Sequence, residues 1–258
     1  MSQMDGAAVA HAADEDRRTR ESYEQWHKKL DVDKSLDTPW HQLLLATLDR
    51  SDVENRCILD IACGRGGLAC RLVRTHPRHL VAADFSFEAV SKGQTFARAN
   101  GLDTIAWQVA DATRLPHPDE AFDTVISCET LEHLPDIRGA LRGFARVLKP
   151  NGRLFLTTPN YLGPLGLYRG YMRARGRRFT EEGQPINRFL LLPLSVALVR
   201  QAGLEVTAVE SVGHYVPWPG RVPIRLGRVD SLPLAKWFGH HTLIVATKPS
   251  VQHGYSPR

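Results

Sequence analysis

The stretch that decides the fold runs from Cys57 to Gly67 and reads CILDIACGRGG. Its first five residues are mostly apolar, which is typical of a short strand buried on both faces. Glycines at the following turn let the backbone pass close to a ligand, because glycine has no Cβ. The helix predicted next, over residues 66–74, would present unpaired backbone N–H groups at its N-terminus. The sequence therefore predicts a ligand-binding turn between a strand and a helix.

Strands and helices alternate on the C-terminal side of this unit. We predict strands at residues 57–61, 79–83, 105–109, 122–127 and 153–158, and two later β segments at 204–209 and 242–247. Ser86 is the predicted N-cap of a helix that ends near Ala99, and another helix covers residues 136–148. This alternation predicts an α/β fold with a parallel sheet and helices on both faces. The last two β segments are expected to pair antiparallel at the sheet edge.

We expect one domain over residues 21–258, preceded by a disordered segment at 1–20. Apolar spacing of three and four predicts two amphipathic helices within residues 21–50. Residues 160–187 are rich in glycine and arginine and break the pattern, which indicates an insertion or lid. A helix over residues 189–202 then ends at Gly203, a suitable C-cap.

The composition is that of a water-soluble globular chain. It has 258 residues, a net charge of +5 and a pI near 9.2. No run approaches the roughly 18 apolar residues that a membrane span needs. None of the four cysteines forms a C-x-x-C pair, so neither disulfides nor a zinc site is expected, and a reducing cytoplasm fits best.

Acidic residues follow consecutive predicted strands. Asp60 ends the first strand, Asp84 ends the second, Asp111 follows the third and Glu129 follows the fourth. Carboxyl ends of parallel strands lie at one edge of an open α/β sheet, where ligands bind. The sequence therefore predicts one site lined by these acids.

Two ligand classes fit the glycine turn. Gly64-x-Gly66-x-x-Ala69, with Asp84 about 20 residues on, satisfies the loose dinucleotide pattern, so an NAD-dependent oxidoreductase is one interpretation. Asp60, however, would repel a pyrophosphate and suits a cationic amino group. In a simpler interpretation Asp84 caps the next helix and Asp111 is a turn residue. A non-catalytic module that keeps the cofactor fold is the third alternative.

The chain resembles the class I S-adenosylmethionine-dependent methyltransferases, and within them the branch of ubiquinone-pathway and bacterial small-molecule enzymes. The resemblance covers about residues 55–160. The matching segments are CILDIACGRGG, VAADFS, VADATRLP and FDTVISCETLEHLPD, followed by VLKPNGRLFLTTPN. It implies a Rossmann-like, doubly wound, mainly parallel seven-stranded sheet with an antiparallel edge strand. It also implies S-adenosylmethionine as cofactor and methyl transfer as the activity.

The resemblance assigns cofactor contacts residue by residue. The methionine part of the cofactor would be surrounded by Asp60, Ala62, Gly64 and Gly66. The ribose would be held by Asp84, and the adenine would pack on Phe85 and be recognised by Asp111 and Ala112. A backbone contact near the methionine end would come from Cys128. Ala62 stands where the family usually has glycine, which is tolerable if its φ is negative.

A base is needed only if the acceptor is a hydroxyl or a protonated nitrogen. His133 and Glu129 are the candidates after the fourth strand, and a helical segment there would bring them to one face. Glu129, Glu132 and His133 are an alternative metal site, which a distant histidine such as His214 would complete. In the simplest interpretation Glu132 and His133 only order the loop.

The expected acceptor is a small molecule, which is a sugar, a lipid-linked compound or a secondary metabolite. The methylated atom is expected to be an oxygen or a nitrogen of that molecule. The predicted insertion carries Tyr168 and Tyr171 among arginines, which suit phosphate or carboxylate and favour an anionic acceptor. These arginines are Arg169, Arg173, Arg175, Arg177 and Arg178. No RNA-binding domain is apparent, so no nucleic-acid partner is expected.

Overall fold

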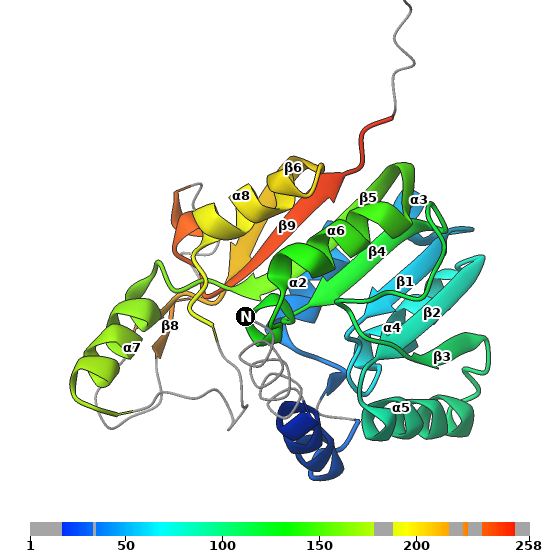
Figure 1. The fold of residues 1–258 in the computed structure, drawn as a ribbon, viewed down its shortest axis with the longest axis horizontal. Helices are drawn as coiled ribbons and strands as arrows, with labels where there is room; N and C mark the ends of the chain where they lie inside the picture. Colours follow the sequence, from blue (N-terminus) through cyan, green and yellow to red (C-terminus); the bar gives the residue numbers. More distant parts are fainter. Residues whose placement is uncertain (1–16, 33–34, 178–187, 217–223, 227–233, 251–258) are drawn as a thin grey trace, which may run out of the picture.

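The computed structural model describes residues 17–32, 35–177, 188–216, 224–226 and 234–250. Its centre is a seven-stranded sheet of order β3-β2-β1-β4-β5-β9-β6 with helices on both sides (Figure 1). The strands are β1 (Cys57–Ile61), β2 (His79–Asp84), β3 (Ile105–Val109), β4 (Phe122–Cys128), β5 (Leu148–Pro159), β6 (Glu205–Val212) and β9 (His241–Thr247). A separate pair, β7 (Tyr215–Val216) and β8 (Ile224–Arg225), is antiparallel. The predicted α/β class is confirmed.

The sheet is parallel from β3 to β5. Strand β9 runs antiparallel to both of its neighbours, β5 and β6. The predicted antiparallel pairing of the last two segments is therefore confirmed, with the reversed strand one place in from the edge. On one side of β1 the chain adds β2 and then β3. On the other side of β1 it adds β4 and then β5. The carboxyl ends of β1 and β4 are consequently the topological switch point, where open α/β sheets bind ligands.

The helices predicted after β1, β2 and β4 and before β6 are present, whereas one further helix lies within residues 160–187, the segment predicted as an insertion. They are α2 (Pro39–Thr47), α3 (Arg50–Val53), α4 (Gly67–Leu72), α5 (Phe87–Ala99), α6 (Ile137–Val147), α7 (Pro164–Ala174) and α8 (Leu192–Gln201), with short 3₁₀ turns η2 (Val73–Thr75), η3 (Leu131–His133) and η5 (Ala235–Trp237). The Ser86 side chain accepts a hydrogen bond from the Ala89 N–H at 3.1 Å, which confirms it as the N-cap of α5. Among the described residues, no helix is long and apolar enough to cross a membrane.

Alternating strand residues build the core on the two sides of the sheet. Leu59 and Val125 belong to one buried cluster, with side chains of α6 and α8. Ile58 and Ile126 belong to the other, with side chains of α2 and α4. Because successive strand residues point to opposite faces, a strand covered on both sides must be apolar throughout. This explains the continuous apolar runs in the sequence.

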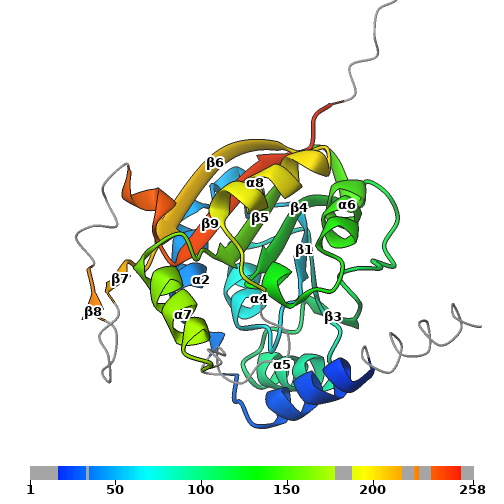
Figure 2. The same cartoon turned by 60° about the vertical axis from the view of Figure 1, so that its left-hand side comes forward.

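The N-terminal helix, residues 17–28, differs from the prediction. Residues 17–20 were expected to belong to a disordered segment at 1–20, yet they are helical and continue into the predicted first helix. The polar composition of this stretch hid its partners, which are charged groups rather than apolar ones. Figures 1 and 2 show the helix lying beside α5. Residues 1–16 lie outside the described part of the chain, as do residues 178–187 of the predicted insertion.

Candidate functional site

The carboxyl ends of β1, β2 and β3 bring Asp60, Asp84 and Asp111 to one edge of the sheet. Asp60 is only 1% exposed, and its Oδ2 has no hydrogen-bond partner among the described residues. Burial, and then the negative charge of Asp84, raise the pKa of the Asp60 carboxyl to about 7. A buried carboxylate without a partner is costly. The tip of β1 is therefore prepared for a cationic group.

Asp84 joins the glycine turn to the start of α5. Its Oδ2 accepts from the Gly64 N–H at 2.8 Å, and its Oδ1 accepts from the Ser86 N–H at 2.9 Å. Burial raises the pKa of Asp84 to about 6 in spite of these two hydrogen bonds. Asp84 therefore links these two segments but does not cap α5, whose N-cap is Ser86. Each carboxylate oxygen also keeps a second acceptor position, which suits a hydroxyl donor.

The turn after β1 holds three residues in the left-handed region. Gly64 has φ +54°, Gly66 has φ +72° and Ala62 has φ +57°. The condition of a negative φ at Ala62 is therefore not met, and its methyl group sits in a strained backbone. A Cβ on Gly66 would lie 2.1 Å from the Trp107 ring, so glycine is required there for packing as well. At Gly64 the nearest atom to such a Cβ would be in His27, at 3.8 Å.

Asp111 is held by its own turn and by the N-terminal helix. Its Oδ1 accepts from the N–H and hydroxyl of Thr113, and its Oδ2 accepts from the Arg20 guanidinium. Burial alone would raise the pKa of Asp111, but these hydrogen bonds lower it below its usual value. Ala112 beside it is buried. Asp111 and Ala112 therefore lie at the β3 edge, where both carboxylate oxygens of Asp111 already accept hydrogen bonds, one of them from Arg20.

The N-terminal helix covers this edge of the sheet, a feature that sequence reasoning missed. Glu24 accepts three hydrogen bonds at the start of α5, from the Ser86 hydroxyl (2.9 Å) and from the N–H groups of Phe87 (2.8 Å) and Glu88 (3.1 Å). Tyr23 is only 6% exposed and packs edge-on against Phe85, with ring centroids 5.5 Å apart. The helix therefore encloses the residues predicted to hold the nucleoside.

Lys92 of α5 fixes the other end of the N-terminal helix. Its Nζ donates to the carbonyl oxygens of His27, Lys28 and Leu30 at 2.8–3.1 Å. Carbonyl oxygens in the last turn of a helix have no N–H partner four residues further on within the helix, and a cation also complements the helix dipole. No periodicity in the sequence indicates this contact, because it joins residues more than 60 positions apart.

Glu129 and Glu132, which were predicted to form one cluster, lie apart after the end of β4. Glu129 has a left-handed backbone (φ +48°) and its Oε2 lies 3.2 Å from His241 Nδ1. Glu132 lies in η3, where its Oε1 is 3.4 Å from His133 Nε2. Because η3 begins after Glu129, the two carboxylates are not on one helical face and each meets a different imidazole.

A metal site formed by these residues finds no support in the geometry. Within the described ranges, no three His, Cys, Asp or Glu side chains gather as a metal-binding group. The distant candidate His214 is buried, and its Nε2 lies 2.7 Å from the Ala235 carbonyl oxygen. His241, which sequence reasoning did not identify, is the histidine that meets Glu129. Only its place at the start of a strand next to β5 could have indicated it.

The thiols at this edge are poor nucleophiles. Burial, and then nearby carboxylates including Asp60, raise the pKa of both Cys63 and Cys128 well above the usual value. All four cysteines are free. Cys128 at the tip of β4 is therefore unsuited to thiolate chemistry, and its backbone contact with a cofactor stays a prediction.

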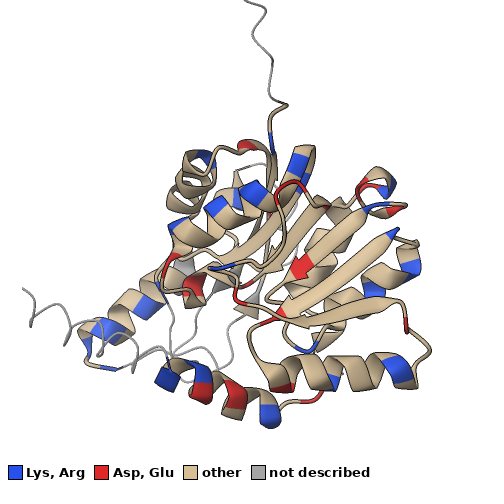
Figure 3. Cartoon of the chain, turned by 45° about the vertical axis from the view of Figure 1, so that its right-hand side comes forward, with Lys and Arg blue, Asp and Glu red and all other residues tan. Residues whose placement is uncertain are grey.

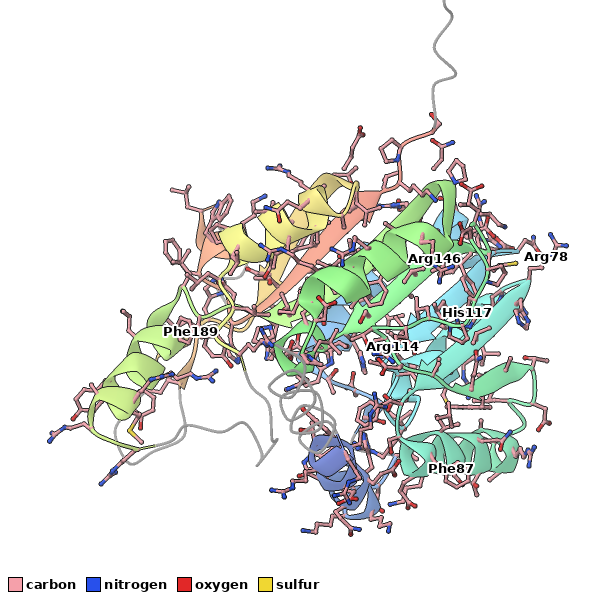
Figure 4. The ribbon with its side chains drawn as sticks, in the orientation of Figure 1. Arg78, Phe87, Arg114, His117, Arg146 and Phe189 are labelled. Atoms are coloured by element: carbon pink, nitrogen blue, oxygen red, sulfur yellow. The ribbon has the colours of Figure 1, made fainter. Side chains whose placement is uncertain are left out.

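Arginines of the predicted insertion lie along α7, where Figure 3 shows basic and no acidic positions. The Arg169 guanidinium lies over the Tyr161 ring at 4.3 Å and over Phe189 at 5.6 Å. Tyr161 and Phe189 are themselves stacked, and Figure 4 places Phe189 beside α7. Arg175 lies over Tyr171. Arg178 lies outside the described residues.

Comparisons with known proteins agree with this architecture. Residues 59–156 match the methyltransferase domain family. The chain is 35% identical over 163 residues to 27-O-demethylrifamycin SV methyltransferase of Amycolatopsis mediterranei, covering 61% of this chain and 57% of that protein. It is 35% identical over 98 residues to the O-methyltransferase resE of Aspergillus sclerotiorum, covering 38% and 39%. The matches thus span about two fifths to three fifths of these relatives.

The fold has a close structural counterpart as well. An S-adenosylmethionine-dependent methyltransferase from Mesorhizobium loti superimposes with a TM-score of 0.59 at 18% identity, covering 82% of this chain and 99% of that one. At such low identity the likeness concerns the fold.

Proposed function

We propose that this protein, whose residues 59–156 match the methyltransferase domain family, is a class I S-adenosylmethionine-dependent methyltransferase that methylates a small molecule. S-adenosylmethionine would bind at the carboxyl ends of β1, β2 and β3. The acceptor would lie beside it, over β4, β5 and β9. The observation that carries the proposal is the buried Asp60 carboxylate beside a glycine turn.

The residues present fit this cofactor. Asp60 Oδ2 lacks a partner among the described residues, and the ammonium group of the cofactor would supply one. Asp84 has acceptor positions left for ribose hydroxyls, while Phe85, Asp111 and Ala112 would meet the adenine. The backbone of Gly64 and Cys128 would line the methionine end. When bound, the cofactor supplies a methyl group activated by a positively charged sulfur.

The N-terminal helix would exclude water from the site. Tyr23 packs on Phe85, and Glu24 holds the start of α5, so the nucleoside would be enclosed between this helix and the sheet edge. Positioning and exclusion of water supply most of what a methyl transfer needs from its enzyme, because the leaving group departs without covalent help.

The acceptor we propose is a hydroxyl compound of the secondary-metabolite type. Two relatives are named for a rifamycin intermediate and for O-methyl transfer, which supports an oxygen nucleophile. An anionic group on the acceptor would meet the arginines of α7, where Arg169 is held over Tyr161. Four free cysteines fit a reducing compartment, and we propose the cytoplasm.

Competing functions are disfavoured by particular residues. An NAD-dependent oxidoreductase would need a pyrophosphate beside the turn, where Asp60 and Asp84 place two carboxyl groups in a buried setting. A module that had lost the cofactor would have no use for a buried carboxyl whose pKa is raised to about 7, since an apolar residue there would stabilise the fold. A module that still binds the cofactor is separated from an enzyme by the transfer assay that follows.

The proposal is tested by methyl transfer from labelled S-adenosylmethionine to 27-O-demethylrifamycin SV and to a panel of phenols, sugars and amines. We expect label in an organic product with wild-type protein, and labelling about 10- to 100-fold slower with Asp60→Asn when S-adenosylmethionine is kept below its Kd. If the rate of turnover is unchanged after EDTA is added, the hypothesis of a metal site at Glu129, Glu132 and His133 is excluded. Absence of transfer to every acceptor, together with NAD-linked oxidation of any of them, would refute the proposal.

A further inference from the structure

Glu129 has a backbone conformation that its surroundings impose. Its φ of +48° lies in the left-handed region, which costs a residue with a Cβ about 1 kcal/mol or more. Two hydrogen bonds hold it there, because the Glu129 N–H donates to both the carbonyl oxygen and the hydroxyl of Thr157, at 3.0 and 3.1 Å. Strain of this kind persists at functional sites. Here it accompanies a carboxylate directed across β5 to the first residue of β9.

That residue is His241, whose Nδ1 lies 3.2 Å from Glu129 Oε2. A carboxylate only accepts hydrogen bonds, so it selects the imidazole tautomer that carries its hydrogen on Nδ1. Nε2 of the neutral ring then has a free lone pair. No described residue forms a hydrogen bond with Nε2 of His241. This is the arrangement of a base that a carboxylate orients from behind.

The neighbouring histidines do not compete for a proton. Burial is the main cause that lowers the pKa of His240 to about 3, and electrostatic repulsion from its neighbours His241 and Arg169 adds to it. Burial is also the main cause that lowers the pKa of His41 to about 4. The centroids of the Trp40 and His241 rings lie 4.9 Å apart, so Trp40 packs against His241. At neutral pH His41 and His240 are therefore uncharged, and His241 is the ring in this group that contacts a carboxylate.

The second glutamate–histidine pair lies elsewhere. His133 contacts Tyr23 of the N-terminal helix at 5.9 Å between ring centroids, and Tyr23 packs on Phe85 after β2. His133 is thus on the side of the site where the nucleoside would bind. Glu129 and His241 lie at the tips of β4 and β9, on the side left for the acceptor.

We propose that His241, oriented by Glu129, is the general base that accepts the proton of the acceptor hydroxyl. As the new bond forms between the acceptor oxygen and the methyl carbon, the bond from that carbon to sulfur breaks and its electron pair stays on sulfur. The hydroxyl proton moves to His241 Nε2, and the imidazolium is stabilised by Glu129. This inference rests on the proposed function for its co-reactant.

The geometry is tested first without cofactor or acceptor. In protein labelled with ¹⁵N-histidine, two-bond correlation spectra report which ring nitrogen of His241 carries the hydrogen, and His241→Gln assigns the signals. We expect a protonated Nδ1 and an unprotonated Nε2 in wild type, and loss of this preference in Glu129→Leu. An Nε2–H tautomer in wild type, or no change in Glu129→Leu, would overturn the proposal.

The role in turnover is tested by kinetics with S-adenosylmethionine and 27-O-demethylrifamycin SV, or the best acceptor from the panel above. We expect kcat to fall about 100-fold or more in His241→Gln, the usual contribution of a general base. The Kd for S-adenosylhomocysteine, by calorimetry, should stay within about threefold. Added imidazole should restore part of the turnover in His241→Gly.

His133→Gln is the matched variant for the rival base. A loss of kcat confined to His133→Gln, or an equal loss in both variants, would refute the assignment to His241. Failure of wild-type protein to bind S-adenosylhomocysteine would instead refute the proposed function. The tautomer measurement stands apart from both, so the two failures are distinguishable.

Discussion

Replacing Asp60 with asparagine should stabilise the free protein and weaken cofactor binding. The raised pKa of Asp60, about 7 against 3.8 in an unfolded chain, means that ionisation opposes folding. This cost is absent below pH 3.8, grows as the pH rises, and is constant above about pH 7. It amounts to about 2 kcal/mol at pH 5 and about 4 kcal/mol at pH 8. Asp60→Asn removes it, less about 1–3 kcal/mol for a buried amide with unmatched donors.

The pH dependence is the decisive part, since the amide penalty is the same at every pH. Urea unfolding at pH 5, 6, 7 and 8 should show the stability advantage of Asp60→Asn over wild type growing by about 2–3 kcal/mol across that range. Asp123→Asn is the control. Burial alone would raise the pKa of Asp123, but the Cys57 N–H and Lys149 lower it, so its effect should not change between pH 5 and 8. A pH-independent difference for Asp60→Asn would refute the reasoning.

Two further substitutions test the turn and the N-terminal helix. Ala62→Gly should raise the free energy of unfolding by about 1 kcal/mol, because it relieves an alanine in the left-handed region. Ala69→Gly, inside α4, should lower the free energy of unfolding by about the same amount or more. Equal effects of the two substitutions in urea unfolding would contradict this. Glu24→Ala should free three donors at the start of α5 and speed tryptic cleavage within residues 17–20 several-fold. Glu21→Ala, on the exposed side of the same helix, should not, and equal cleavage of the two variants would show that Glu24 does not fix the helix.

The sheet could be predicted because its signals are local. Apolar runs such as residues 57–61 and the polar Ser86 cap identify strands and a helix start without knowledge of distant residues. The conformation at Ala62 could not be predicted, because the turn that joins β1 to α4 imposes a positive φ whatever residue stands there.

In the candidate site too, the residues that local sequence signals mark were predicted, and those placed by contacts between distant segments were not. Asp60, Asp84 and Asp111 were identified because strand ends of a parallel sheet share one edge. His241 was missed because its partner Glu129 is 112 residues away and only the antiparallel insertion of β9 beside β5 brings them together. The contacts of the N-terminal helix with the sheet edge were missed, because most of them are hydrogen bonds and ion pairs that no apolar periodicity indicates.

Calorimetric titration of the wild-type protein with S-adenosylhomocysteine and, separately, with NAD tests the central claim most directly. We expect S-adenosylhomocysteine to bind once per chain and NAD not to bind. Asp60→Asn should weaken the binding of S-adenosylhomocysteine about 10- to 100-fold, because a charge-assisted hydrogen bond is lost. Binding of NAD alone, or unchanged affinity in Asp60→Asn, would contradict it.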